Sequence, residues 1–157
     1  MYFILFVLLI IVIAVIGVFL NKATSGKGHE VWPFYPRKPL TNPEQILYFR
    51  LLNALPDHII LAQVQLSRFL GVKKGNNFQS WLNRINRLSA DYVICSKDAS
   101  VVAVIELDDA SHNSSKRQET DNKKDKAIRD AGLKIIRWNV KAIPSEDEIK
   151  NLVAPAP

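Results

Sequence analysis

Three carboxylates stand at the ends of two apolar segments in the middle of the sequence. Asp91 begins the first segment, and Glu106 and Asp108 lie at the end of the second, residues 101–107. The turn-forming residues 96–100 separate the segments, which predicts a β-hairpin that brings Asp91 opposite Glu106 or within one residue of it. Side chains alternate along a strand, so Glu106 and Asp108 share a face that Asp91 can also reach. Like charges opposite each other destabilise a sheet, and Mg²⁺ would offset that cost because it prefers carboxylate and water oxygens.

A basic stretch precedes the acidic hairpin. Residues 21–90 carry ten Lys and Arg against three acids, whereas residues 91–157 carry eleven against twelve. Between Asp57 and Asp91 there is no acid, and basic residues are interleaved with aromatic ones: Arg68, Phe69, Lys73, Lys74, Phe78, Trp81, Arg84 and Arg87. Such cations bind phosphates, so the stretch predicts a nucleic-acid surface in which Lys73 and Lys74 contact the substrate. A solvated face attracted to anionic lipid is the alternative.

The first twenty residues are apolar. Residues 2–20 carry no charge, and at about 1.5 Å per residue they would span the ~30 Å hydrocarbon core. We therefore expect a transmembrane anchor at 1–20, with a cleaved signal peptide as the alternative. Basic residues follow the apolar run and none precedes it, so the positive-inside rule predicts a single-pass membrane protein with its C-terminal domain in the cytoplasm.

The remainder is long enough for one domain with a single core. We expect a Gly- and Pro-containing linker at 21–40, the domain at 41–142 and a C-terminal tail at 143–157. Cys95 is the only cysteine, which excludes an intrachain disulfide and a thiolate metal site.

Apolar spacing and turn residues predict the elements of this domain. Helices are expected at 41–56, 78–88 and 115–131, and strands at 59–66, 92–95, 101–107 and 133–138. Thr41 and Glu44 have the spacing of a capping box, so Glu44 is either a helix cap or a site acid. The last two strands flank a helix, which implies a right-handed crossover and parallel pairing. The order predicts an α/β sandwich with a mixed sheet.

The combined motifs resemble a known family, the bacterial domain of unknown function 2726. They are Thr41 to Glu44, Gln63 on a strand, Asp91 with the following Tyr-Val-Ile, Ile105 to His112, residues 116–125, and Gly132 to Arg137. The family is similar to PD-(D/E)XK nucleases of the very-short-patch-repair endonuclease type. The resemblance implies a restriction-endonuclease-like fold over about residues 40–140, a mixed sheet flanked by helices. Because the family is bacterial, it also implies that the expected anchor lies in the bacterial inner membrane. Asp91 and Glu106 would match the metal-binding acids, and Glu44 the acid often found on the first helix.

The chain departs from the superfamily pattern at one position. A lysine is expected two residues after the second acid, where this sequence has Asp108. Activation of the attacking water would then fall to His112, to Lys124 or to a second metal ion held by Asp108.

The leading hypothesis is a membrane-anchored nuclease, dependent on Mg²⁺ or Mn²⁺, that hydrolyses phosphodiester bonds in nucleic acid, with DNA as the expected partner. Asp91, Glu106 and Asp108 would bind the metal, His112 or Lys124 would handle the proton, and Lys124 and Arg137 would steady the phosphate. Gln63 is either a polar group at the sheet surface or a substrate ligand. The alternative function is a catalytically inactive nucleic-acid-binding or protein-interaction module with a nuclease-like fold.

Overall fold

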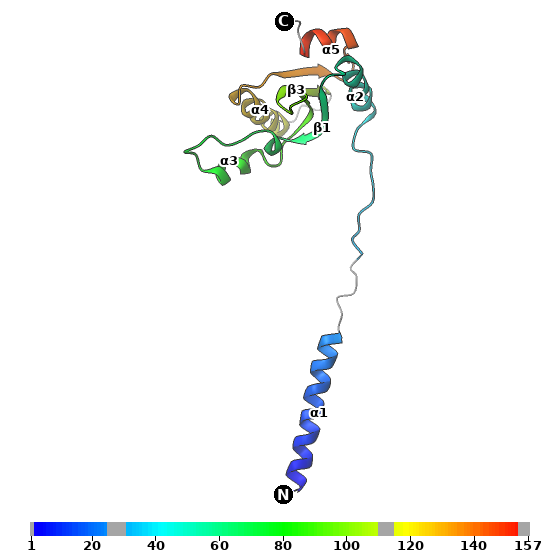
Figure 1. Ribbon diagram of the computed structural model, residues 1–157, viewed down its shortest axis with the longest axis vertical. Helices are drawn as coiled ribbons and strands as arrows, with labels where there is room; N and C mark the ends of the chain where they lie inside the picture. Colours follow the sequence, from blue (N-terminus) through cyan, green and yellow to red (C-terminus); the bar gives the residue numbers. More distant parts are fainter. Residues whose placement is uncertain (1, 25–30, 110–114, 154–157) are drawn as a thin grey trace. The chain divides into compact units, whose positions relative to one another are not determined.

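The structure is a computed structural model that describes residues 2–24, 31–109 and 115–153 (Figure 1). The chain divides into two compact units, Met1–Arg37 and Lys38–Pro157. The first unit contains one helix, α1 (Tyr2–Thr24), within its described residues. The second unit contains all the residues that the sequence predicts for the functional site.

The described part of the chain contains no helix that is both long and apolar enough to cross a membrane. This finding corrects the expected transmembrane anchor at 1–20. It equally corrects the expected location as a single-pass inner-membrane protein.

The second unit is built on a four-stranded mixed sheet, as the sequence predicts. The strands are β1 (Ile59–Gln65), β2 (Ser89–Cys95), β3 (Val101–Asp108) and β4 (Ile135–Asn139), in the spatial order β1-β2-β3-β4. β1, β2 and β3 pair antiparallel, whereas β3 and β4 pair in parallel. The crossover between the parallel strands contains the helix α4 (Ser115–Asp130).

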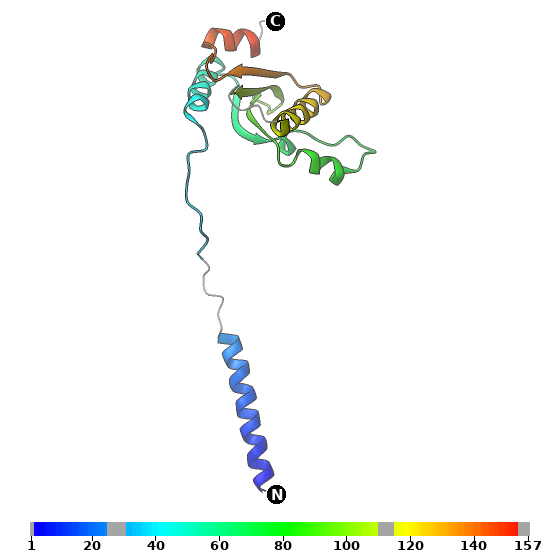
Figure 2. The same ribbon diagram turned by 180° about the vertical axis from the view of Figure 1, so that it is seen from behind.

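Helices cover both faces of the sheet (Figures 1 and 2). On one face, α2 (Asn42–Ala54) and α5 (Glu146–Val153) contribute to a buried cluster that includes Leu47, Leu51, Tyr92, Ile105 and Ile149. On the other face, α4 and the short 3₁₀ helix η1 (Leu66–Arg68) contribute to a second cluster that includes Leu66, Val93, Val104 and Ile128. Adjacent residues of β2 and β3 belong to opposite clusters because side chains alternate along a strand.

The helix ends follow from local polar contacts. The Glu44 carboxylate accepts hydrogen bonds from the Thr41 N–H at 2.5 Å and from the Thr41 hydroxyl at 2.7 Å. The Asn77 side chain accepts from the Ser80 N–H at 2.9 Å and so caps α3 (Phe78–Ile85). Gly132 follows α4 with φ of +80°, a left-handed conformation that glycine adopts without steric cost.

The expected C-terminal tail at 143–157 contains the helix α5 instead. Ser145 and Glu148 exchange hydrogen bonds at its start, and Ile149 and Val153 are buried. These two side chains pack in the cluster that α2 also lines, so the helix gains its stability from tertiary contact.

The hairpin register places the predicted acids side by side. Tyr92 pairs with Ile105 and Val93 with Val104, so the next pair along the ladder would be Asp91 with Glu106. At the same edge of the sheet, Gln65 pairs with Ser89 and Asp108 with Asn139. We call this edge, formed by residues 63–65, 89–91, 106–108 and 137–139, the site edge.

Candidate active site

Glu106 is the one buried charged residue in the described part of the chain, with 2 % of its surface exposed. Its Oε2 contacts the ammonium group of Lys124, while its Oε1 is buried and has no hydrogen-bond partner among the described residues. Burial raises the pKa of Glu106 to about 7, although the charge and hydrogen bond of Lys124 act in the opposite direction. An unpartnered buried carboxylate oxygen is costly, so this atom is a candidate ligand position.

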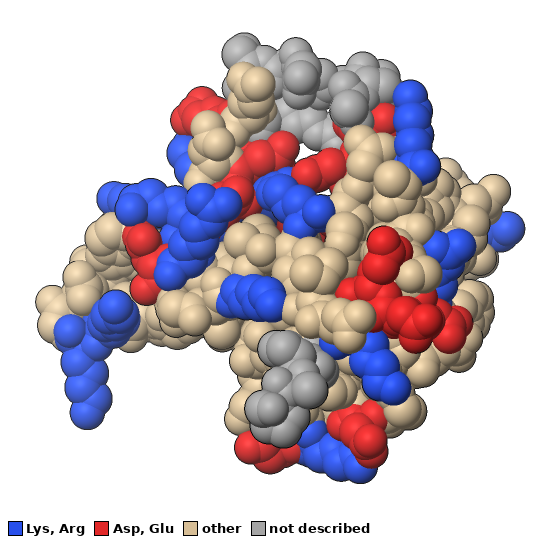
Figure 3. Space-filling model, turned by 90° about the horizontal axis from the view of Figure 1, so that it is seen from above, with Lys and Arg blue, Asp and Glu red and all other residues tan. Residues whose placement is uncertain are grey.

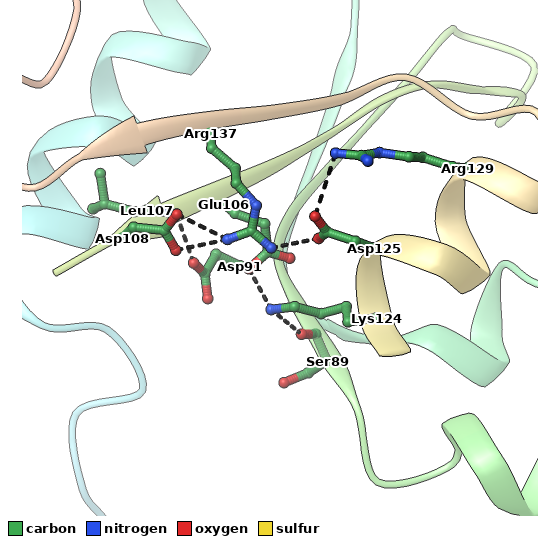
Figure 4. A network of polar contacts seen from close by, with 9 residues as sticks. All are labelled: Ser89, Asp91, Glu106, Leu107, Asp108, Lys124, Asp125, Arg129 and Arg137. Atoms are coloured by element: carbon green, nitrogen blue, oxygen red, sulfur yellow. Dashed lines mark hydrogen bonds and ion pairs between the residues drawn. The ribbon is translucent and has the colours of Figure 1, made fainter. Parts of the chain in front are cut away.

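Asp91 is the second carboxylate of the cluster. Its Oδ2 accepts a hydrogen bond from the backbone N–H of Leu107 at 2.8 Å, which ties the start of β2 to the end of β3 (Figure 4). Burial raises the pKa of Asp91, whereas the Leu107 N–H and the charge of Lys124 lower it. Two neighbouring carboxylates with raised pKa values are typical of a functional site, although a structural ion-pair network also perturbs pKa values.

Lys124 reaches these acids from α4, and 12 % of its side chain is exposed. Besides Glu106, its ammonium group donates to the backbone carbonyl of Ser89 at 3.4 Å. Among the groups that the sequence offers in place of the lysine missing at position 108, Lys124 is therefore the one that the structure brings to Glu106. His112 lies outside the described residues.

Asp108 forms an ion pair with Arg137 on the neighbouring strand β4. Both oxygens of Asp108 accept from Nη1 of Arg137 at 2.8 Å, and Nη2 of Arg137 donates to Asp125 at 2.5 Å. Burial lowers the pKa of Arg137, but the hydrogen bonds and charges of Asp125 and Asp108 outweigh it and leave the pKa above its ordinary value. Arg137 thus links β3, β4 and α4 at the site edge (Figure 4).

The described residues contain no group of three or more His, Cys, Asp or Glu side chains placed to hold a metal ion. Of the three predicted metal ligands, Asp91 and Glu106 form a close pair, whereas Asp108 is neutralised by Arg137. The metal-binding role of these acids stays a prediction.

Gln63 lies on β1 between the pairs Ala62 with Tyr92 and Val64 with Ala90, which places it next to Asp91 across the ladder. Its φ is +53°, an uncommon and strained value for a residue other than glycine. Its amide donates to the second oxygen of Glu44 at 2.9 Å. Gln63 and Glu44 therefore contact each other at the site edge. The capping-box interpretation of Glu44 is confirmed, and its role as a site acid stays a prediction.

Lys73 and Lys74 are not brought to the acids. Both are exposed in the segment between η1 and α3. The face in Figure 3 carries Lys and Arg interspersed with Asp and Glu, so that face is not a continuous basic surface. The substrate-binding role of these lysines stays a prediction.

Sequence reasoning missed two groups of this site, Asp125 and the carbonyl of Ser89. Asp125 immediately follows Lys124 on α4, and its charge beside a lysine was the available signal. Backbone carbonyls carry no sequence signal, so the Ser89 contact required the structure.

The chain is an α/β protein in which a mixed four-stranded sheet lies between two helical layers. It carries an acid–lysine cluster at the site edge. The family described as "Protein of unknown function (DUF2726)" matches residues 37–156, and the chain belongs to this family. Comparison with curated proteins found no match. Comparison with solved structures also found none.

Proposed function

We propose that the chain is a metal-dependent nuclease of the PD-(D/E)XK nuclease-like superfamily that hydrolyses phosphodiester bonds in nucleic acid. The observation that carries the proposal is the buried Glu106, whose Oε1 lacks a partner among the described residues while Asp91 and Lys124 lie beside it. A buried charge that served structure alone would have its oxygens satisfied.

The donor set fits a hard cation. Mg²⁺ in proteins is commonly held by one or two carboxylates, with waters and substrate phosphates completing its octahedron. Asp91 and Glu106 would provide these carboxylates, and Glu106 Oε1 is the oxygen left for a ligand. When bound, Mg²⁺ or Mn²⁺ would supply positive charge at the phosphoryl group and an acidified water.

The other residues would position the reacting atoms. In the hydrolysis, a water oxygen bonds to phosphorus, the bond to one ester oxygen breaks, and that oxygen takes up a proton, which yields a phosphate monoester and a hydroxyl. The ammonium group of Lys124, held by Glu106 and the Ser89 carbonyl, would donate a hydrogen bond to the attacking water or to a phosphate oxygen. Arg137 is held by Asp108 and Asp125, so its main role would be to fix the ends of β3 and β4 and with them the position of Glu106.

Incubation of the full-length chain with single-stranded DNA, duplex DNA and RNA tests the proposal. We expect cleavage with Mg²⁺ or Mn²⁺ and none with EDTA. Glu106→Gln should abolish cleavage because it removes a ligand charge, whereas Glu119→Gln, at an exposed position of α4, should not change it. If the folded wild-type chain cuts none of these substrates with either metal, the proposal fails.

A second function, a catalytically inactive nucleic-acid-binding module, is favoured by the ion pairs themselves. Lys124 contacts Glu106, and Arg137 neutralises Asp108 and Asp125, so cations already balance much of the acidic charge without a metal. Direct titration with Mn²⁺ separates the two functions. The nuclease requires binding that Glu106→Gln weakens, whereas the inactive module predicts no binding at this position.

A further inference from the structure

The helix α3 presents apolar side chains that the described chain leaves uncovered. None of its residues is buried, and Phe78 and Trp81 are 59 % and 47 % exposed. Two large aromatic side chains exposed on one short helix indicate an interaction surface.

A hollow adjoins this helix. It has a volume of about 610 Å³ and is lined by residues of η1, α3 and the segments around them: Gln65, Ser67, Arg68, Phe69, Leu70, Gly71, Phe78 and Leu82. The lining combines an aromatic ring of α3 with the guanidinium-bearing side chain of Arg68. This combination suits a ligand that is both planar and anionic.

The charge around the hollow is positive. Five exposed cations, Arg68, Lys73, Lys74, Arg84 and Arg87, lie in a segment of the sequence that contains no acid. Within the described ranges, none of the five forms an ion pair. The guanidinium carbon of Arg84 lies 4.2 Å from the centre of the Trp81 ring, which holds a cation beside the exposed indole. We call α3, the hollow and these cations the aromatic–basic surface.

The aromatic–basic surface is connected to the acid–lysine cluster. Gln65, which lines the hollow, pairs with Ser89 in the sheet, and the Ser89 carbonyl accepts from Lys124, which contacts Glu106. A strand held on this surface would therefore pass close to the residues that we propose to act on its phosphates.

We propose that the aromatic–basic surface binds an unpaired stretch of nucleic acid, with bases stacked on Trp81 and Phe78 and with phosphates held by the surrounding cations. The inference rests on the proposed function, since it names the substrate class of that site. Bases in a duplex already stack on each other, so only unpaired bases offer their faces to exposed rings. A second copy of this chain fits poorly because its own basic surface would be repelled.

Anisotropy titrations of the full-length chain in EDTA test the inference. The probes are a labelled single-stranded DNA, its RNA counterpart, the matching DNA duplex and a single strand of abasic sites with the same phosphates. We expect the base-carrying single strands to bind more tightly than both the duplex and the abasic strand. Equal affinity for all four probes would overturn the inference, because phosphates alone would then explain binding.

Substitutions at Trp81 separate stacking from apolar contact. Trp81→Leu should weaken binding of the single strands roughly 10- to 100-fold, because stacking on an aromatic ring contributes that much per base. Trp81→Phe should retain most of the affinity, which shows that a Trp81 variant folds and that a ring is what matters. Phe49→Ala removes a comparably exposed ring on α2 and should have no effect. Equal binding by Trp81→Leu and the wild-type chain would also overturn the inference.

The same variants distinguish failure of this inference from failure of the proposed function. Ring-dependent binding by a chain that cuts nothing supports the surface and rejects the nuclease. Cleavage that Trp81→Leu leaves unchanged supports the nuclease and rejects the surface. A Trp81→Leu variant whose sedimentation changes while its nucleic-acid affinity does not would assign the surface to self-association, and would also reject the inference.

Discussion

Lys124 on α4 contacts the buried carboxylate of Glu106 on β3, eighteen positions earlier in the chain. The superfamily that we propose for the chain would have a lysine two residues after the second acid, where this sequence has Asp108. The parallel crossover returns α4 across the face of the sheet that carries Glu106, and this brings a lysine to the same carboxylate from a helix. Lys124 thus places a cation beside Glu106, although position 108 carries an acid.

Removal of one charge of the Glu106–Lys124 pair should lower stability more than removal of both charges. Lys124→Met leaves a buried carboxylate without its cation, and at about pH 9, well above the pKa of Glu106, we expect it to lower the free energy of unfolding by roughly 3 kcal/mol. Adding Glu106→Gln to Lys124→Met should recover much of that loss, because neither side chain is then charged. Urea unfolding of the single and double variants measures the coupling.

The exposed pair Lys126–Asp130 on the same helix is the control. Its side chains are 76 % and 64 % exposed, and Lys126→Met should change stability by less than about 0.5 kcal/mol. Equal losses for Lys124→Met and Lys126→Met would show that burial of Glu106 adds nothing to the pair.

The pKa of Glu106 makes stability depend on pH. Its folded value of about 7 lies above the ordinary value of 4.5, so between these pH values the folded chain binds more protons than the unfolded chain. Stability therefore falls as pH rises through this window, by up to roughly 3 kcal/mol in metal-free buffer. Glu106→Gln should flatten this slope, and urea unfolding at several pH values in EDTA measures it.

Glu148 provides the control for pH. Hydrogen bonds from Ser145 lower the pKa of Glu148, so its contribution is present above the ordinary value and is lost only in more acidic solution. Glu148→Gln should therefore leave the slope between pH 5 and 7 unchanged. A wild-type slope that Glu106→Gln does not alter would contradict the assignment to Glu106.

Local sequence signals predicted the elements that depend on local interactions. Apolar segments on both sides of the turn-forming residues 96–100 predicted the hairpin, with Asp91 opposite Glu106 or within one residue of it. The observed pairs Tyr92 with Ile105 and Val93 with Val104 place the two acids opposite each other. The capping residues Thr41 and Glu44 and the terminal Gly132 marked helix ends correctly.

Features that depend on distant contacts were not predictable in the same way. The helix α5 is short and depends on burial of Ile149 against the α2 side of the sheet, and the capping-box spacing of Ser145 and Glu148 was its one local signal. The left-handed backbone of Gln63 has no sequence signal, since glutamine rarely adopts it. The length and apolar composition of residues 1–20 predicted a membrane anchor, whereas the described part of the chain contains no helix that is long and apolar enough to cross a membrane.

The stability of the fold should depend on the planar shape of the Arg137 guanidinium group as well as on its charge. Its Nη1 donates to both oxygens of Asp108 and its Nη2 donates to Asp125, so two nitrogens of one planar group hold two carboxylates, which a single lysine ammonium group does not reproduce. We expect Arg137→Lys to lower the free energy of unfolding by about 1 to 2 kcal/mol. Arg129→Lys, which alters a 3.4 Å contact of an exposed arginine with Asp125, should have almost no effect. Indistinguishable urea midpoints for the two variants would mean that contact of Arg137 with two carboxylates is unimportant.

Lys73 and Lys74 should raise nucleic-acid affinity by contacting phosphates, so their contribution should depend on salt concentration. Each cation that neutralises a phosphate of a single strand releases counterions and steepens the dependence of log affinity on log salt by about 0.7. If both lysines contact phosphates, the double variant Lys73→Gln with Lys74→Gln should reduce the magnitude of the slope by roughly 1.4 and weaken binding of all nucleic-acid probes alike.

The double variant Lys97→Gln with Lys150→Gln is the control, because it makes the same change in net charge at exposed positions outside the aromatic–basic surface. Anisotropy titrations at four salt concentrations compare the two. Equal slopes for both double variants would show that net charge, rather than contact at Lys73 and Lys74, governs binding. A reduced slope for the first pair alone would place these lysines on the phosphates of the bound strand.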